Sequence, residues 1–266
     1  RCGALSGRMQ RKPQPAGSPA PYDEFAWLYD RHWGPHSLRK FAPILAEVLL
    51  PRLPAKARVL DVCCGTGQIT RWLSDHSCRV TALDHSRAML KYARKHAPRA
   101  AFVLAEAEAF SLPPCHAAAV SMFDSLNHIL TPAKLTAAFR RILAALVPGV
   151  VFFCDFNIRR KFRAGWRGDF SLLEDDHACI VRTRYEDATR RAHWNIAMFR
   201  KNRRGTWARS DLHLVQRAYE ESEIRRALAA AGFTGIEIWD TDRTPAGLTP
   251  LPPGKTYFLA RKALKR

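Results

Sequence analysis

The stretch from Arg58 to Thr70 constrains the fold of this chain more than any other part of its sequence. The run from Val59 to Val62 is mostly apolar and strand-favouring, which is typical of a strand buried on both faces of a parallel sheet. Gly65 and Gly67 then permit a tight turn in which a ligand can approach the bare backbone. A helical pattern follows, and the free N–H groups of a helix N-terminus suit an anion. The stretch therefore predicts a strand, a ligand-binding turn and a helix.

A second strand is predicted over Arg79–Asp84, and it ends in an acid. A carboxylate at such a strand tip can accept hydrogen bonds from both hydroxyls of an adenosine ribose. The dinucleotide fingerprint requires a glycine where this chain has Cys63. This displacement disfavours a nicotinamide-dependent dehydrogenase.

Four motifs together resemble those of class I S-adenosylmethionine-dependent methyltransferases. Asp61–Gly67 and Asp84 resemble the first two motifs. Leu104–Glu108 resembles the acid-plus-alanine element that borders the adenine, and Ala119–His128 resembles the fourth-strand motif beside the transferred methyl group. The resemblance implies S-adenosylmethionine as cofactor and a Rossmann-like α/β fold, with a mostly parallel seven-stranded sheet and helices on both faces.

The same resemblance implies which residues contact the cofactor. An N-terminal helix with aromatic residues at helical spacing is similar to the lid of small-molecule methyltransferases, and Tyr22 and Tyr29 lie on it. The alternative is that these aromatic residues form a stripe that packs on the core and has no role in binding. The implied cofactor-binding residues are Tyr22, Tyr29, Asp61, Cys63, Gly65, Gly67, Asp84, Glu106, Ala107 and Phe123.

Strand and helix patterns alternate along the core, which predicts a parallel sheet covered by helices. Strands are expected near 58–62, 79–83, 101–104, 118–122, 149–155, 236–240 and 256–261, and helices near 38–50, 67–75, 86–96, 132–146 and 220–231. Residues 158–217 break this rhythm with three strand patterns separated by turns, near 180–185, 193–199 and 207–215. We expect a disordered leader over 1–20, lid helices and the cofactor-binding core over 21–157, a small antiparallel substrate-facing insertion over 158–217, and completion of the core over 218–266.

Candidate catalytic and substrate-binding residues follow the fourth strand or lie in the insertion. His128 and His213 are the candidate bases, and both also fit a hydrogen-bonded structural histidine. The candidate substrate-binding residues are Asp124, Asn127, Trp194 and Arg217, although Trp194 also fits the apolar core of the insertion. No metal site is predicted, because the histidines are scattered and no Cys-x-x-Cys pair occurs.

The charge of the chain leaves the class of acceptor open. Its 43 Lys and Arg residues against 24 Asp and Glu give a net charge of +19, which invites binding to nucleic acid. Arginine dominates the basic residues and is spread over the whole chain, as a codon bias would produce. The favoured function is therefore methylation of an O or N atom of a small molecule. The alternatives are an RNA (tRNA) methyltransferase and an inactive protein that only binds S-adenosylmethionine.

Cysteine usage and hydropathy predict a cytoplasmic protein without a membrane partner. Seven cysteines form an odd count without regular spacing, which suits a reducing compartment. No apolar run reaches the roughly 18 residues that a membrane span needs. The oligomeric state does not follow from the sequence.

Overall fold

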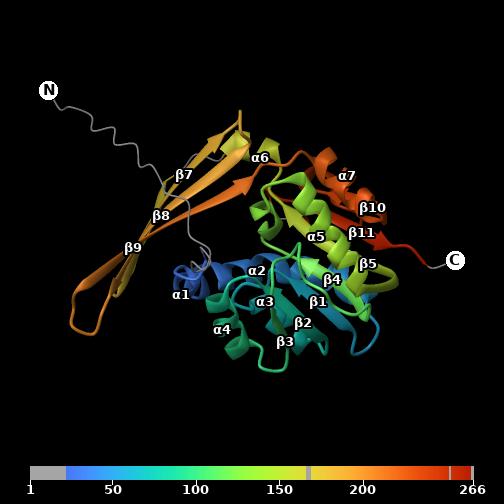
Figure 1. The fold of residues 1–266 in the computed structure, drawn as a ribbon, viewed down its shortest axis with the longest axis horizontal. Helices are drawn as coiled ribbons and strands as arrows, with labels where there is room; N and C mark the ends of the chain where they lie inside the picture. Colours follow the sequence, from blue (N-terminus) through green and yellow to red (C-terminus); the bar gives the residue numbers. More distant parts are fainter. Residues whose placement is uncertain (1–21, 166–168, 252, 265–266) are drawn as a thin grey trace.

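A seven-stranded sheet forms the centre of the computed structural model, which describes residues 22–165, 169–251 and 253–264 (Figure 1). The predicted leader over 1–20 lies outside these residues. The strands lie in the order β10-β11-β5-β4-β1-β2-β3, and only β11 runs opposite to the others. Their bounds are Arg58–Val62 (β1), Arg79–Asp84 (β2), Ala101–Leu104 (β3), His116–Ser121 (β4), Leu146–Phe156 (β5), Phe233–Trp239 (β10) and Thr256–Lys262 (β11). The predicted fold class is confirmed.

Helices cover both faces of this sheet because its strands bury side chains on both sides. Leu60 and Val62 of β1 point into one hydrophobic cluster, whereas Val59 points into a second cluster on the opposite face. The first cluster includes apolar residues of α5 (Pro132–Ala145) and α7 (Glu221–Ala231), and the second includes those of α2 (Gly34–Ile44) and α3 (Gln68–Asp75). Helix α4 (Arg87–His96) follows β2.

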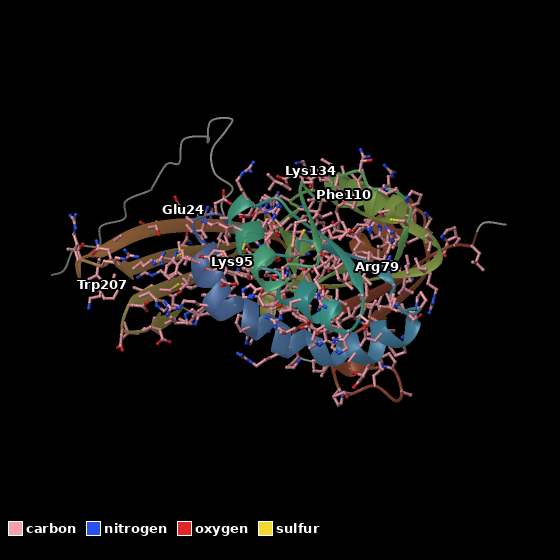
Figure 2. The ribbon with its side chains drawn as sticks, turned by 90° about the horizontal axis from the view of Figure 1, so that it is seen from below. Glu24, Arg79, Lys95, Phe110, Lys134 and Trp207 are labelled. Carbon is pink, nitrogen blue, oxygen red and sulfur yellow. The ribbon has the colours of Figure 1, made fainter. Side chains whose placement is uncertain are left out.

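A second sheet, entirely antiparallel, extends away from the central sheet between β5 and α7 (Figure 1). It contains β6 (Phe170–Leu173), β7 (His177–Glu186), β8 (Arg191–Lys201) and β9 (Trp207–Arg217), in this order. In Figure 2, Trp207 marks the far end of this sheet and Lys134 marks the central part of the molecule. The three strand patterns predicted in the insertion lie within β7, β8 and β9, whereas β6 and the short helix α6 (Arg159–Gly165) were not predicted.

The N-terminal segment, residues 22–52, joins the two sheets. Its helix begins with α1 (Ala26–Leu28), widens into π-helical turns over Tyr29–Trp33, continues as α2 and ends with π- and 3-10 turns at Arg52. The side chains of Phe25 and Leu28 are buried against apolar residues of the antiparallel sheet. Part of the aromatic stripe is therefore core. No helix among the described residues is long and apolar enough to span a membrane.

Candidate functional site

The loop after β1 has an unusual backbone that brings two helices close to it. Cys63, Gly65 and Gly67 all have positive φ angles, of 61°, 54° and 85°. A Cβ atom on Gly67 would lie 2.8 Å from the Cα atom of Ala93 in α4, and one on Gly65 would lie 3.4 Å from the ring of Tyr29. Glycine at these two positions thus allows α4 and the N-terminal segment to pack against the loop.

Asp84, at the end of β2, fixes the same loop. One of its carboxylate oxygens accepts a hydrogen bond from the N–H of Gly65, and the other accepts one from the N–H of Ser86, both at 2.9 Å. Burial raises the pKa of Asp84, although His85 and the backbone donors oppose this shift. Each oxygen retains a further lone pair for a ligand.

The main cavity, of about 890 Å³, lies at the carboxyl ends of the central strands. Its lining includes Cys63, Asp84, Ala105, Phe123 and Asn157, which end or directly follow β1 to β5. This is the edge where ligands bind in open α/β sheets. The N-terminal segment, β8 and β9 complete the wall. The predicted cofactor-binding residues that line the cavity are Tyr22, Tyr29, Cys63, Gly65, Asp84, Glu106, Ala107 and Phe123.

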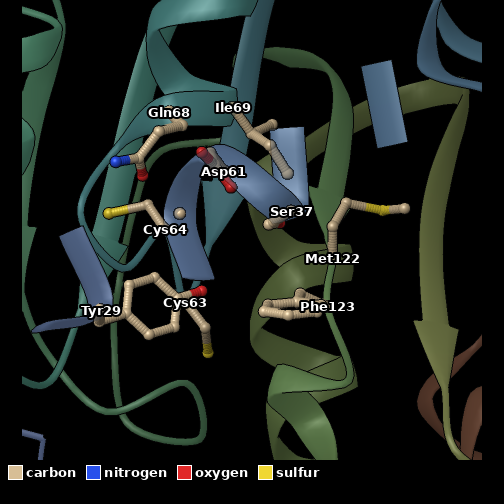
Figure 3. Close-up of a pocket in the computed structure, with 10 residues that line it drawn as sticks. Tyr29, Ser37, Asp61, Cys63, Cys64, Gln68, Ile69, Met122 and Phe123 are labelled. Carbon is tan, nitrogen blue, oxygen red and sulfur yellow. The ribbon is translucent and has the colours of Figure 1, made fainter. Parts of the chain in front are cut away.

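The other two predicted cofactor residues lie just outside this lining. Gly67 is at the start of α3, where its role is to allow the contact with α4. Asp61 borders a small adjoining cavity of about 20 Å³, and Figure 3 shows it beside Cys64 and Gln68. Asp61 accepts a 2.6 Å hydrogen bond from the hydroxyl of Thr70, and burial raises the pKa of its carboxyl group to about 7.

His128 connects the central sheet with the N-terminal segment and the antiparallel sheet. Its Nδ1 lies 3.1 Å from the carbonyl oxygen of Val215, which can only accept, so Nδ1 carries the proton. Its Nε2 is therefore an acceptor and lies 2.8 Å from the hydroxyl of Tyr22. Burial lowers the pKa of His128 to about 4, so the imidazole is neutral at pH 7.

A buried ionic cluster supports the floor of the cavity next to His128. Lys255, in the turn before β11, contacts Asp124, and its Nζ lies 3.3 Å from a carboxylate oxygen of Asp155. Burial lowers the pKa of Lys255, but the two carboxylates outweigh this effect and raise it overall. The side-chain amide of Gln216 donates a 2.6 Å hydrogen bond to Asp124. Both oxygens of Asp124 are thus engaged by protein groups, although Asp124 lines the cavity.

The remaining predicted residues divide between the cavity and the protein interior. His213 and Trp194 line the cavity, and Nε2 of His213 lies 3.0 Å from Nδ1 of His193. Asn127 is fully buried outside the lining, where its amide bonds the backbones of Asn157 and Arg217.

Arg217 also lies outside the cavity lining and pairs with Glu223 at 3.2 Å. The geometry therefore gives Asn127 and Arg217 structural contacts rather than the substrate contacts expected from their positions in the sequence.

Sequence reasoning missed several residues of the site: Lys40, Lys161, Gln216 and Lys255. Gln216 directly follows the strand predicted near 207–215, and no local pattern marked it as a site residue. Lys255 precedes an antiparallel strand, whose start meets the carboxyl ends of the parallel strands. The order of the strands in the sheet would have located Lys255, but no local sequence pattern marks it.

Comparison with known proteins places this site in a family. A family model described as a methyltransferase domain matches residues 59–149. The chain is 30% identical to the dTDP-3-amino-3,6-dideoxy-alpha-D-glucopyranose N,N-dimethyltransferase of Streptomyces fradiae over 260 residues, which are 93% of this chain and 98% of the relative. The chain belongs to the S-adenosylmethionine-dependent methyltransferases.

Two further comparisons agree with this identification. The methyltransferase is 29% identical to the dTDP-3-amino-3,4,6-trideoxy-alpha-D-glucopyranose N,N-dimethyltransferase of Streptomyces venezuelae, over 71% of this chain and 80% of the relative. The crystal structure of an S-adenosylmethionine-dependent methyltransferase from Clostridium acetobutylicum ATCC 824 has the same fold. Its TM-score is 0.75 at 21% identity, over 92% of this chain and 100% of that chain. The predicted enzyme of small-molecule type and its cofactor are confirmed.

Proposed function

We propose that this methyltransferase methylates the amino nitrogen of an amino sugar that is carried by a nucleoside diphosphate. The observation that carries the proposal is the division of charge along the main cavity. Asp84 and Glu106 line it near β2 and β3, where a further acid, Glu108, is paired with Lys134. Lys40 and Lys161 line it together with the residues that follow β5 and precede β11. An acidic end suits the hydroxyls and amines of S-adenosylmethionine, and a basic end suits an anionic acceptor.

Lys40, at the basic end, lies near two carboxylates that Lys255 already engages. Among the described residues, neither Lys40 nor Lys161 has a carboxylate within salt-bridge distance. The pKa of Lys40 is lowered, first by burial and then by repulsion from Lys255 and Lys161, and attraction to Asp155 and Asp124 offsets this only in part. Two cations that repel each other and lack a salt-bridge partner gain from a bound dianion, such as a diphosphate. The relatives named above act on dTDP-linked amino sugars.

The acidic end accounts for the predicted cofactor residues. Asp84 has lone pairs for the ribose hydroxyls, and Glu106 with Ala107 would border the adenine. The loop at Gly65 would hold the methionine portion at the start of α3, where N–H groups suit its carboxylate. The residues present therefore fit S-adenosylmethionine. Tyr22 and Tyr29 would cover it and exclude water.

The arrangement of His128 and Tyr22 supports methyl transfer to an amine. When bound, S-adenosylmethionine supplies a methyl group on a positively charged sulfur, so the protein has mainly to align the acceptor nitrogen. An ammonium group must first lose a proton to expose its lone pair. The hydroxyl oxygen of Tyr22 would take this proton while its own proton passes to Nε2 of His128, which is unprotonated and faces this hydroxyl.

A direct assay tests the proposed function. We expect the enzyme with S-adenosylmethionine to methylate dTDP-3-amino-3,6-dideoxyglucose, detected by mass spectrometry, and to use the same sugar without its nucleotide at least about tenfold less efficiently. Replacing Lys40 and Lys161 together by alanine should raise the KM for the nucleotide-linked acceptor and leave the Kd for S-adenosylmethionine unchanged. Lys91→Ala, on the exposed face of α4, is the matched control.

Two results would contradict the proposal. One is an unchanged acceptor KM in the double lysine variant. The other is methylation of unfractionated tRNA without turnover of the amino sugar nucleotide, which would favour the RNA acceptor suggested by the net charge of the chain.

A further inference from the structure

Gln216 is the point at which the antiparallel sheet meets the centre of the site. It lies near the end of β9, is 3% exposed and lines the main cavity. Its side-chain nitrogen lies 2.6 Å from a carboxylate oxygen of Asp124 and 3.2 Å from Nε2 of His128. The amide is thus inserted between an acid and an imidazole.

The chemistry of its neighbours fixes the orientation of this amide. The carboxylate of Asp124 accepts hydrogen bonds, so the NH₂ group of Gln216 faces it. The second N–H points toward Nε2 of His128, which has a lone pair because the proton is on Nδ1. The amide oxygen is buried and has no hydrogen-bond partner among the described residues. A flipped amide would satisfy this oxygen no better, because it would place it against two acceptors.

The groups around His128 act on its charge in opposite directions. Burial lowers the pKa of His128 most and His85 lowers it further, whereas Asp124 and the carbonyl group of Val215 raise it. Tyr22 approaches from the N-terminal segment, and Lys255 is held on the far side of Asp124. Among the described residues, no Lys or Arg side chain forms a hydrogen bond with His128 itself. The N–H groups of Gln216 therefore separate the carboxylate from the imidazole.

We infer that Gln216 is a positioning residue that adds to burial in keeping His128 neutral, with Nε2 unprotonated and facing the hydroxyl of Tyr22. The inference rests on the proposed function in so far as a neutral His128 serves to accept the proton of the amine. In that step the N–H bond of the ammonium breaks and an O–H bond forms at Tyr22, whose own proton moves to Nε2. The freed lone pair then forms the C–N bond while the electrons of the C–S bond return to sulfur.

Nitrogen-15 NMR of the histidines tests the inference without an acceptor. The full-length wild-type protein, with His128 assigned by the loss of its signals in a His128→Phe variant, should show the neutral form protonated at Nδ1 at pH 7. Gln216→Glu and Gln216→Leu both remove donation to Nε2. We expect the titration midpoint of His128 to rise by about one pH unit or more in at least the Gln216→Glu variant, where a further acid faces the ring.

Kinetics give a second, independent readout. If His128 must be neutral, kcat should fall as the pH drops through the titration of His128, and this acidic limb should lie about one pH unit higher in Gln216→Glu than in the wild type, with little change in the KM for S-adenosylmethionine. Asn202→Asp, in the exposed β8–β9 turn, adds the same charge far from the cavity and should change neither readout.

The outcomes separate the inference from the proposed function. If His128 titrates identically in both Gln216 variants and the wild type, or if the wild type carries the proton on Nε2, the inference is wrong whatever the acceptor is. If the NMR shifts occur but no amino sugar nucleotide is methylated, the positioning role stands and the proposed function fails.

Discussion

Asp61 combines deep burial with a place next to the glycine loop, and this makes its charge sensitive to pH near neutrality. Its side chain is 2% exposed, and its pKa is raised to about 7, mainly by burial. A carboxyl group whose pKa is raised by folding favours the folded state below its ordinary pKa, and this contribution is lost as the pH rises toward 7. We expect Asp61 to ionise when it attracts the amino group of S-adenosylmethionine.

Cofactor affinity should therefore increase with pH. Between pH 5.5 and 7, the Kd for S-adenosylmethionine, measured by calorimetry, should fall by up to about tenfold per pH unit. Asp61→Asn should abolish this slope. Asp84→Asn should weaken binding at every pH and keep the slope, since Asp84 is expected to contact the ribose. A pH-independent Kd in the wild type would place Asp61 away from the cofactor amine.

At the scale of elements, the contact between the glycine loop and α4 predicts unequal effects of two glycine substitutions. Gly67 and Gly205 both have positive φ angles, of 85° and 79°. A Cβ on Gly67 would lie 2.8 Å from backbone of α4, whereas one on Gly205 would have nothing within 4 Å. Gly205→Ala should lose only about 1 kcal/mol of stability from backbone strain. Gly67→Ala should lose at least about 2 kcal/mol more, because α4 must move.

Urea unfolding of the two alanine variants measures this difference in the free energy of unfolding. Because the loop would shift with α4, Gly67→Ala should also weaken cofactor binding, and Gly205→Ala should not. Equal losses of stability would mean that α4 accommodates the added methyl group freely.

The burial of each strand and helix explains why some elements could be predicted from the sequence and others could not. Strands β1, β2, β4 and β5 are buried on both faces, so their apolar runs are visible in the sequence. Strand β6 has four residues and mostly exposed side chains, and therefore carries no alternating pattern. Helix α6 is Arg-rich and buries only Phe162 among its hydrophobic residues, so it lacks an apolar stripe. The π-helical turns before Gly34 also leave no trace in the helical spacing of the aromatic residues.

At the scale of the whole molecule, the cofactor half of the site was predictable and the acceptor half was not. The proposed cofactor residues outside the N-terminal segment lie between Asp61 and Phe123, in loops that follow consecutive strands. The basic end is assembled from α2, α6 and the turn before β11, which are widely separated in the sequence. Only the fold brings Lys40, Lys161 and Lys255 together, and isolated lysines in a chain with net charge +19 attract no notice.

His128 is where the N-terminal segment, the central sheet and the antiparallel sheet meet, so its protonation should affect the stability of the entire molecule. Its pKa is lowered from 6.5 to about 4, first by burial. The unfolded chain therefore binds a proton that the folded protein excludes. Stability from this group is present above pH 6.5 and is lost as the pH falls to 4, by roughly 3 kcal/mol.

The prediction concerns the difference between the wild type and His128→Phe, because other buried groups also titrate in this range. The free energy of unfolding of the wild type minus that of the variant should decrease between pH 6.5 and 4. Tyr257→Phe is the control, since its buried hydroxyl has no hydrogen-bond partner in the described part of the chain and burial raises its pKa, so its difference should stay constant. A constant difference for His128→Phe as well would mean that the imidazole can be protonated in the folded protein without a loss of stability.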